Sequence, residues 1–121
     1  MIENKINLTV PFPPSVNTYW GFRGSRRFLT SRATVFKGIV AAEFARCGHE
    51  GLGESRLAVT IKLYPPDRRV RDIDNVVKST LDALCQAGVF ADDGQIDMLH
   101  VTRENVVKWG AAEIFIESLA K

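Results

Sequence analysis

The chain of 121 residues lacks the features that mark several common classes of protein. It has only two cysteines, Cys47 and Cys85, and neither has a ligand-spaced companion, which favours free thiols over a zinc site or a disulfide framework. No apolar run approaches the roughly 20 residues of a membrane span. Residues 1–5 lack the charged and apolar regions of a signal peptide. We therefore expect a cytoplasmic location and no membrane partner.

Several catalytic motifs are absent as well. The sequence has no glycine-rich phosphate loop, no Ser/His/Asp order and no Cys/His nucleophile pair. The two histidines, His49 and His100, have no evident partners, and His100 falls in an expected strand, where a partly buried ring is the simpler interpretation. No small-molecule cofactor is expected, and the chemistry rests on carboxylates, lysines and arginines.

Charge is distributed unevenly along the sequence. Residues 22–71 contain eleven Lys and Arg against four Asp and Glu, a local net charge of +7, whereas residues 72–121 contain four against nine, a local net charge of −5. A basic surface beside an acidic pocket suits a polyanion that one part of the protein binds and another part cuts with a metal ion. The alternative is that the two halves of the sequence do not correspond to faces of the molecule.

Hydrophobic periodicity predicts an α/β fold of the α+β two-layer sandwich type. Alternating apolar and polar residues predict strands at 6–10, 57–64, 95–104 and 111–118. Helical spacing predicts helices at 31–46 and 75–87. We expect the last two strands to form a hairpin. The order β-α-β-α-β-β implies a mixed sheet packed by two helices, in a single domain spanning residues 1–121.

The most informative segment is Arg-Asp-Ile-Asp-Asn-Val-Val-Lys at residues 71–78. Asp72 and Asp74 flank Ile73 where the chain should be extended, so both carboxylates should point the same way, with Cα atoms roughly 6.6 Å apart and Ile73 in the core. Lys78 follows one helical turn after Asp74. Carboxylates at a helix entrance beside a lysine can hold a hard divalent cation and a phosphate together, which predicts metal-dependent cleavage of a phosphodiester.

Each of these residues also has a simpler explanation. Asp74 suits a helix N-cap. Lys78 is spaced for a surface ion pair with Asp82. Asp92 and Asp93 precede a glycine and suit a turn. The combination, rather than any single residue, favours a catalytic site.

Basic residues gather in two segments that suit contacts with nucleic acid. The stretch 17–28 interleaves arginines with aromatic residues, and arginines meet phosphates while rings stack on unpaired bases. It lies within a predicted loop over 15–30, which equally suits a solubilising loop whose aromatic side chains pack on the body. A second basic loop spans 67–71. The candidate DNA-binding residues are Arg26, Arg27, Arg68, Arg69, Arg71 and Asn75.

These motifs resemble those of the RusA family, Holliday-junction resolvases of bacteria and their phages. Pro-Phe-Pro-Pro-Ser-Val-Asn at residues 11–17 is similar to the opening of that family. The run at 66–75 resembles its proline- and arginine-rich approach to Arg-Asp-x-Asp-Asn. The segments 82–84 and 87–88 resemble the helix that follows, and 92–93 resembles its acidic close. The resemblance covers nearly the whole chain.

The resemblance implies a Mg²⁺-dependent endodeoxyribonuclease that acts as a homodimer and resolves four-way junction DNA by symmetric nicks, in recombination and repair. It implies metal carboxylates at Asp72, Asp74 and Asp93, and it places Lys78 on an essential lysine, so that these four are the catalytic candidates. Two other functions stay open: a non-catalytic module that binds branched DNA, and a less selective structure-specific nuclease. The number of metal ions and the dimer interface are also open.

Overall fold

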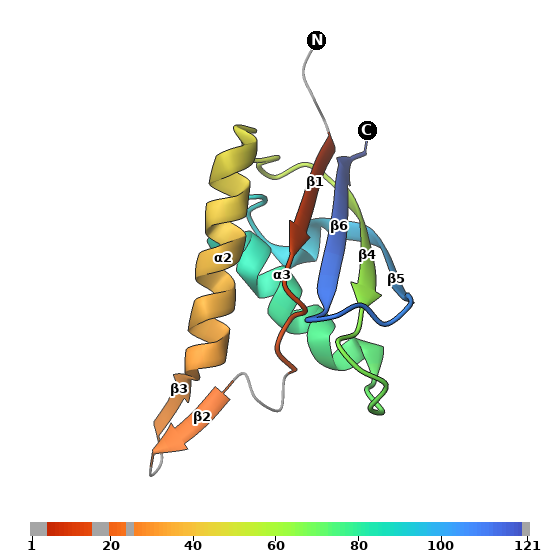
Figure 1. Cartoon of the computed structure of the whole chain (residues 1–121). Helices are drawn as coiled ribbons and strands as arrows, with labels where there is room; N and C mark the ends of the chain where they lie inside the picture. The colour runs from red at the N-terminus through yellow and green to blue at the C-terminus, as the bar shows by residue number, and fades with distance from the viewer. Residues whose placement is uncertain (1–4, 16–19, 24–25, 120–121) are drawn as a thin grey trace.

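The computed structural model of the chain describes residues 5–15, 20–23 and 26–119. Two helices pack against one face of a four-stranded mixed sheet (Figure 1). The sheet has the order β1-β6-β4-β5, with β1 antiparallel to β6, β6 antiparallel to β4, and β4 parallel to β5. This arrangement confirms the predicted α+β two-layer sandwich with a mixed sheet.

The four-stranded sheet and the helices that cover it take up most of the described chain. The strands of the sheet are β1 (Lys5–Val10), β4 (Leu57–Tyr64), β5 (Ile96–Arg103) and β6 (Ala111–Ser118). The helices are α2 (Ser31–Cys47) and α3 (Val77–Gln86), with short 3₁₀ helices η1 (Ile73–Val76) and η2 (Asp93–Gln95). No helix among the described residues is long and apolar enough to cross a membrane.

The core forms where the alternating face of the sheet meets the helices. In β4, Leu57, Val59, Ile61 and Leu63 are at most 2% exposed, as period-2 alternation predicts. Phe36 and Val40 of α2 pack into the same cluster. The predicted start of α2 is confirmed, because Thr30 Oγ1 accepts a hydrogen bond from Ala33 N at 3.4 Å.

The predicted hairpin between the last two strands is wrong, because β4 lies between β5 and β6. The connection from Glu104 to Gly110 crosses the end of β4, where Glu104 N donates to Leu63 O at 2.7 Å and Val107 N donates to Pro65 O at 3.0 Å. Periodicity identifies strands, but it carries no information about which strands are neighbours.

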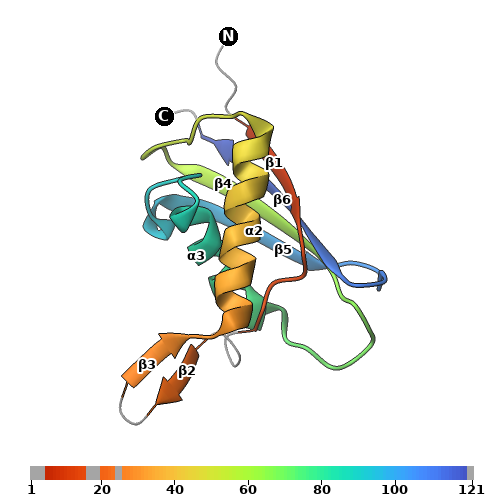
Figure 2. The same cartoon turned by 60° about the vertical axis from the view of Figure 1, so that its left-hand side comes forward.

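The segment 15–30, predicted as a loop, contains a two-stranded antiparallel ribbon. Strand β2 (Trp20–Arg23) pairs with β3 (Arg26–Leu29). The ribbon leads into the first turn of α2 and extends away from the four-stranded sheet (Figure 2). Arg26 and Arg27 lie on β3, and their predicted DNA contacts fall on side chains outside the described part of the structure.

Candidate active site

The acidic motif enters α3 through the 3₁₀ helix η1. Asp72 is extended, with φ −86° and ψ 132°, and its carbonyl accepts a hydrogen bond from Asn75 N at 3.1 Å. The extended conformation predicted for both aspartates holds for Asp72 and is wrong for Asp74, because the chain already turns at Ile73. The helix predicted to begin at Asn75 therefore begins earlier, as a tighter turn.

The residue that anchors this turn is Val76 rather than Ile73. Ile73 is 36% exposed, whereas Val76 is 3% exposed and belongs to the core. The buried hydroxyl of Thr80 secures the carbonyl of Val76, since Thr80 Oγ1 donates to it at 2.7 Å. The turn at Ile73 changes which side chains face inward, and the extended-chain prediction did not include it.

The two carboxylates of the motif have no partner in the part of the chain that the structure describes. Asp72 and Asp74 are exposed, and neither side chain makes a hydrogen bond or an ion pair within the described residues. The predicted N-cap role of Asp74 is wrong, because Asp72 stands at the N-cap position of η1 and Asp74 lies inside the first turn. Both carboxylates are therefore available to an external ligand.

Lys78 joins the two acidic segments. Its Nζ lies 3.0 Å from Asp82 Oδ1 and 3.1 Å from Asp93 Oδ2. Hydrogen bonds to Asp82 and then to Asp93 raise the pKa of Lys78 above its usual value, so the amine stays protonated at neutral pH. The ion pair with Asp82 is confirmed, and the same ammonium also reaches Asp93.

The two members of the late acidic pair differ in their surroundings. Asp92 caps η2, because its Oδ2 accepts a hydrogen bond from Gly94 N at 2.8 Å. Gln95 completes the capping box by accepting from Asp92 N at 2.8 Å, and it donates to Ser55 O at 2.6 Å. The turn predicted for the pair is confirmed for Asp92, which leaves Asp93 as the member directed toward Lys78.

Gln95 was not singled out from the sequence, although the signal was present. A Gln three residues after an Asp is the spacing of a capping box. Gln95 is 7% exposed and ties η2 to the connector before β4, since its Nε2 also donates to Gly53 O at 2.9 Å. This residue positions Asp93 through the turn that it closes.

The described residues contain no group of three or more His, Cys, Asp and Glu side chains that is assembled as a metal site. Asp72 and Asp74 stand beside the entrance to α3, while Asp93 is engaged by Lys78. The donors themselves fit a hard divalent cation, because such ions prefer carboxylate oxygens and Mg²⁺ takes one or two carboxylates with several waters. The metal role of the three aspartates stays a prediction.

The basic loop before Asp72 is organised by Asp67. Arg71 Nη1 lies 2.8 Å from Asp67 Oδ1, and Arg69 Nη2 lies 3.2 Å from Asp67 Oδ2. Hydrogen bonds from Arg71 and then Arg69 hold the pKa of Asp67 well below its usual range. Asp67 was not predicted as a site residue, and its two-residue and four-residue spacing from the arginines is a weak signal.

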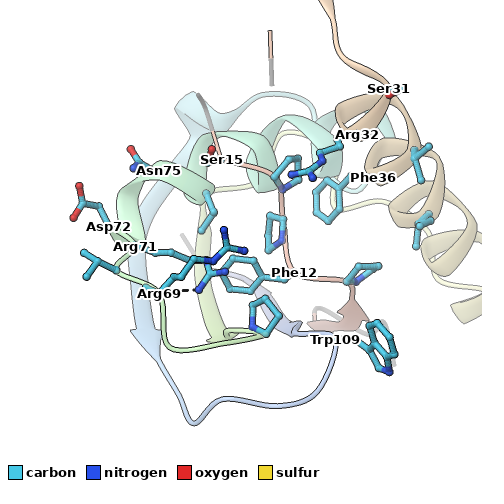
Figure 3. A pocket seen from close by; sticks show the side chains of 18 residues that line it. Phe12, Ser15, Ser31, Arg32, Phe36, Arg69, Arg71, Asp72, Asn75 and Trp109 are labelled. Atoms are coloured by element: carbon cyan, nitrogen blue, oxygen red, sulfur yellow. Dashed lines mark hydrogen bonds between the residues drawn. The ribbon is translucent and has the colours of Figure 1, made fainter. Parts of the chain in front are cut away.

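A cavity of about 720 Å³ opens beside this loop, with Asp72 and Asn75 among its lining residues (Figure 3). Of the predicted DNA-binding residues, Arg69, Arg71 and Asn75 line it. Arg68 is exposed on the same loop but does not line the cavity. The structure thus brings the second basic segment together with the start of the acidic motif.

Two exposed carboxylates, a lysine that pairs with Asp93 and an arginine-lined cavity, on a small α+β fold, are features that suit a nucleic-acid-cleaving enzyme. Residues 11–117 match the model of the family described as Endodeoxyribonuclease RusA. The chain belongs to this family, and the resemblance drawn from the motifs is confirmed.

Curated relatives cover almost the full length of the chain. The chain is 34% identical over 116 residues to a crossover junction endodeoxyribonuclease rusA of Enterobacteria phage HK97, with 96% of this chain and 97% of the relative covered. It is 32% identical over 120 residues, at the same coverage, to the proteins named crossover junction endodeoxyribonuclease RusA in Escherichia coli (strain K12) and Enterobacteria phage 82. A nuclease of this family is consistent with a divalent-metal requirement.

Proposed function

We propose that the chain is a Mg²⁺-dependent endodeoxyribonuclease that resolves four-way DNA junctions by paired symmetric nicks, in recombination and repair. The observation that carries the proposal is the pair of exposed carboxylates, Asp72 and Asp74, which have no partner among the described residues and precede a protonated Lys78. Family membership and the names of the relatives supply the substrate class.

The proposed ligands of the metal are Asp72, Asp74 and Asp93. A bound Mg²⁺ supplies a more acidic water and offsets negative charge on the phosphate. Lys78, held charged by Asp82 and Asp93, donates hydrogen bonds to a phosphate oxygen that gains charge during the reaction. A phosphate that accepted the hydrogen bonds of Lys78 would leave the carboxylate of Asp93 free to hold the metal.

Assembly and location complete the proposal. A four-way junction carries two strands to cut, related by a two-fold axis, and one carboxylate cluster per chain provides one active site. Paired nicks then need two chains, and a two-fold homodimer is the simplest arrangement. We propose a single domain over residues 1–121 that acts in the cytoplasm.

A panel of four-way junctions, flaps, bubbles and linear duplexes, incubated with and without Mg²⁺, tests the proposed function. We expect paired nicks in the junctions alone, and only when Mg²⁺ is present. Equal cutting of flaps would support a less selective nuclease. Tight junction binding in Ca²⁺ with no cleavage in Mg²⁺ would support a binding module instead.

The homodimer has a separate test. A mixed dimer of wild-type and Asp74→Asn chains should nick one strand and leave the junction joined. Light scattering that reports a monomer at concentrations where both strands are cut would contradict the two-chain arrangement.

A further inference from the structure

The cavity extends well beyond the candidate catalytic carboxylates. Asp72 and Asn75 lie at one end and Trp109 at the opposite end, with Phe12 and the arginines of the basic loop between them (Figure 3). Only the first end adjoins the residues proposed for phosphodiester cleavage. The whole cavity has a volume of about 720 Å³, and the part beyond the Asp72 end remains to be explained by something other than the reacting phosphate.

The wall of this cavity is apolar and held in place. Phe36 of α2 is 4% exposed, and Phe12 and Pro14 belong to the segment after β1. Ser79 Oγ of α3 donates to Pro14 O at 2.6 Å, which fixes that segment against the helix that carries Lys78. Concave sites that combine apolar and aromatic side chains with placed polar groups are typical binding sites for organic ligands.

The rim of the cavity is basic. Arg32, Arg69 and Arg71 line it, and the side chain of Arg71 is 23% exposed while its guanidinium lies 5.6 Å from the centroid of the Phe12 ring. Asp67 forms ion pairs with two of these arginines, Arg69 and Arg71. A guanidinium fork held in this way recognises phosphate oxygens with little loss of side-chain freedom.

Trp109 is held exposed by a strained backbone. The indole is 83% exposed, and Trp109 has φ 72°, a left-handed conformation that bulky residues rarely adopt. The next residue, Gly110, packs so closely that a Cβ there would lie 2.8 Å from Phe12 Cβ, and its N–H donates to Val107 O at 2.9 Å. Lys108 Nζ lies 5.5 Å from the centroid of the Trp109 ring, so the exposed indole stands beside a basic group that can meet a phosphate.

We propose that this cavity binds an unpaired segment of the DNA strand being cut. One base lies against the Phe12 and Phe36 wall, its phosphate lies on Arg69 and Arg71, and a neighbouring base stacks on Trp109. The apolar wall and the exposed indole suit the bases of a nucleic acid, and the basic rim suits its phosphate. An acidic peptide would suit only the rim. The inference rests on the proposed function, because it assigns the reacting phosphate to the Asp72 end.

The occupant has a physical source in the proposed substrate. Bases at the crossover of a four-way junction have an interrupted stack, so removing one from its pair costs less there than inside a duplex. Binding energy from the cavity then helps to place the adjoining phosphate beside Asp72 and Asp74. Junctions would thereby be preferred to linear duplexes without any contact to base edges.

The first test uses a charge placed on the cavity wall. Val35 lines the cavity from α2 and is 59% exposed, so Val35→Glu should fold normally and repel phosphate. Ala41→Glu adds the same charge to an exposed position of α2 that does not line the cavity. In Ca²⁺, we expect a short single-stranded oligonucleotide to bind Val35→Glu roughly 10-fold more weakly than wild type, and Ala41→Glu to match wild type.

The second test reports the base directly. Junctions carrying 2-aminopurine beside the crossover should change in emission when wild-type protein binds in Ca²⁺, because the base leaves its stack. Trp109→Ala should make the bound probe brighter by removing the quenching ring, Val106→Ala should not, and Val35→Glu should abolish the change. Identical emission in wild type, Trp109→Ala and Val35→Glu would overturn the proposal.

The two tests separate failure of the cavity from failure of the proposed function. Suppose that wild type and Val35→Glu cleave junctions at equal rates and bind the oligonucleotide with equal affinity. The proposed nuclease function then stands, and the proposal that the cavity binds unpaired DNA is contradicted. If wild type cuts no junction at all, the proposed function is contradicted. The oligonucleotide titration still tests whether the cavity binds single-stranded DNA. Equal weakening by Val35→Glu and Ala41→Glu would show a general charge effect and also reject it.

Discussion

Asp67 and Asp72 lie in the same loop, yet their surroundings are opposite. Asp67 accepts hydrogen bonds from the backbone and side chain of Arg69 and forms an ion pair with Arg71, whereas Asp72 has no partner among the described residues. A carboxylate that its own chain neutralises shapes a loop. A carboxylate that is exposed and without such partners is accessible to a ligand, so Asp67 belongs to the scaffold of the loop while Asp72 remains a proposed metal ligand.

Replacing the unpartnered carboxylates should have the largest effect. Asp72→Asn or Asp74→Asn should abolish junction nicking while leaving the melting temperature almost unchanged, because each removes a metal ligand at nearly constant shape and breaks no contact. Junction binding should persist or tighten, since repulsion toward phosphate falls. Nicking assays in Mg²⁺, paired with binding in Ca²⁺, measure both.

Asp92→Asn is the matched control for those variants. Asn caps helices as well as Asp does, so this change removes a charge and keeps the η2 turn. We expect nicking close to that of wild type, while Asp93→Asn should behave like Asp72→Asn. Full activity in Asp93→Asn would remove that residue from the proposed site.

Lys78 should come next in effect. Lys78→Ala should slow nicking by about 10²- to 10³-fold, the usual effect of losing one donor to a developing oxyanion. Its stability cost should be small, because Lys78 is an exposed residue whose ion pairs with Asp82 and Asp93 are screened by solvent. Lys78→Arg should rescue poorly, since a planar fork does not replace a compact ammonium. A variant that melts early and cuts normally would reduce Lys78 to a structural ion pair.

Replacing an arginine of the basic loop should have an intermediate effect, on the affinity for DNA rather than on the rate of cleavage. Arg71→Ala should weaken junction affinity and reduce the slope of log affinity against log salt by about 0.9, the value for one lost phosphate contact. Arg46→Ala, at the exposed end of α2, removes the same charge away from the cavity and should leave the slope unchanged. The pair Arg26→Ala and Arg27→Ala tests the ribbon in the same assay, and an unchanged slope would exclude it from the interface.

The smallest expected effect concerns acid. The folded pKa of Asp67 is depressed, so its contribution to stability is fully present above the unfolded carboxyl pKa of about 4 and is lost as pH falls through the folded value. The difference in melting temperature between wild type and Asp67→Asn should therefore be constant at neutral pH and shrink only in strong acid. A difference that disappears already near neutral pH would contradict the pairing of the Asp67 carboxylate with Arg69 and Arg71.

Prediction from sequence succeeded where a local pattern decides the structure. The alternation of β4 and the start of α2 at Ser31 needed only neighbouring residues, and both are confirmed. Prediction failed at Ile73, which is exposed, because a single 3₁₀ turn exchanges the inward and outward sides. It also failed for the pairing of β5 and β6, which depends on β4 entering between them.

The sequence by itself determined the family, the acidic motif with its lysine, the alternation of the core strands and the uneven charge of the two halves. These properties depend on residue identity and on short spacing along the chain, and both can be read from the sequence alone. Only the tertiary structure decided that Asp93 rather than Asp92 meets Lys78, that Asp67 orients the arginines, and that Phe12, Phe36 and Trp109 line one cavity. Such contacts join residues far apart in the chain, and packing brings them together only when the sheet and both helices are in place.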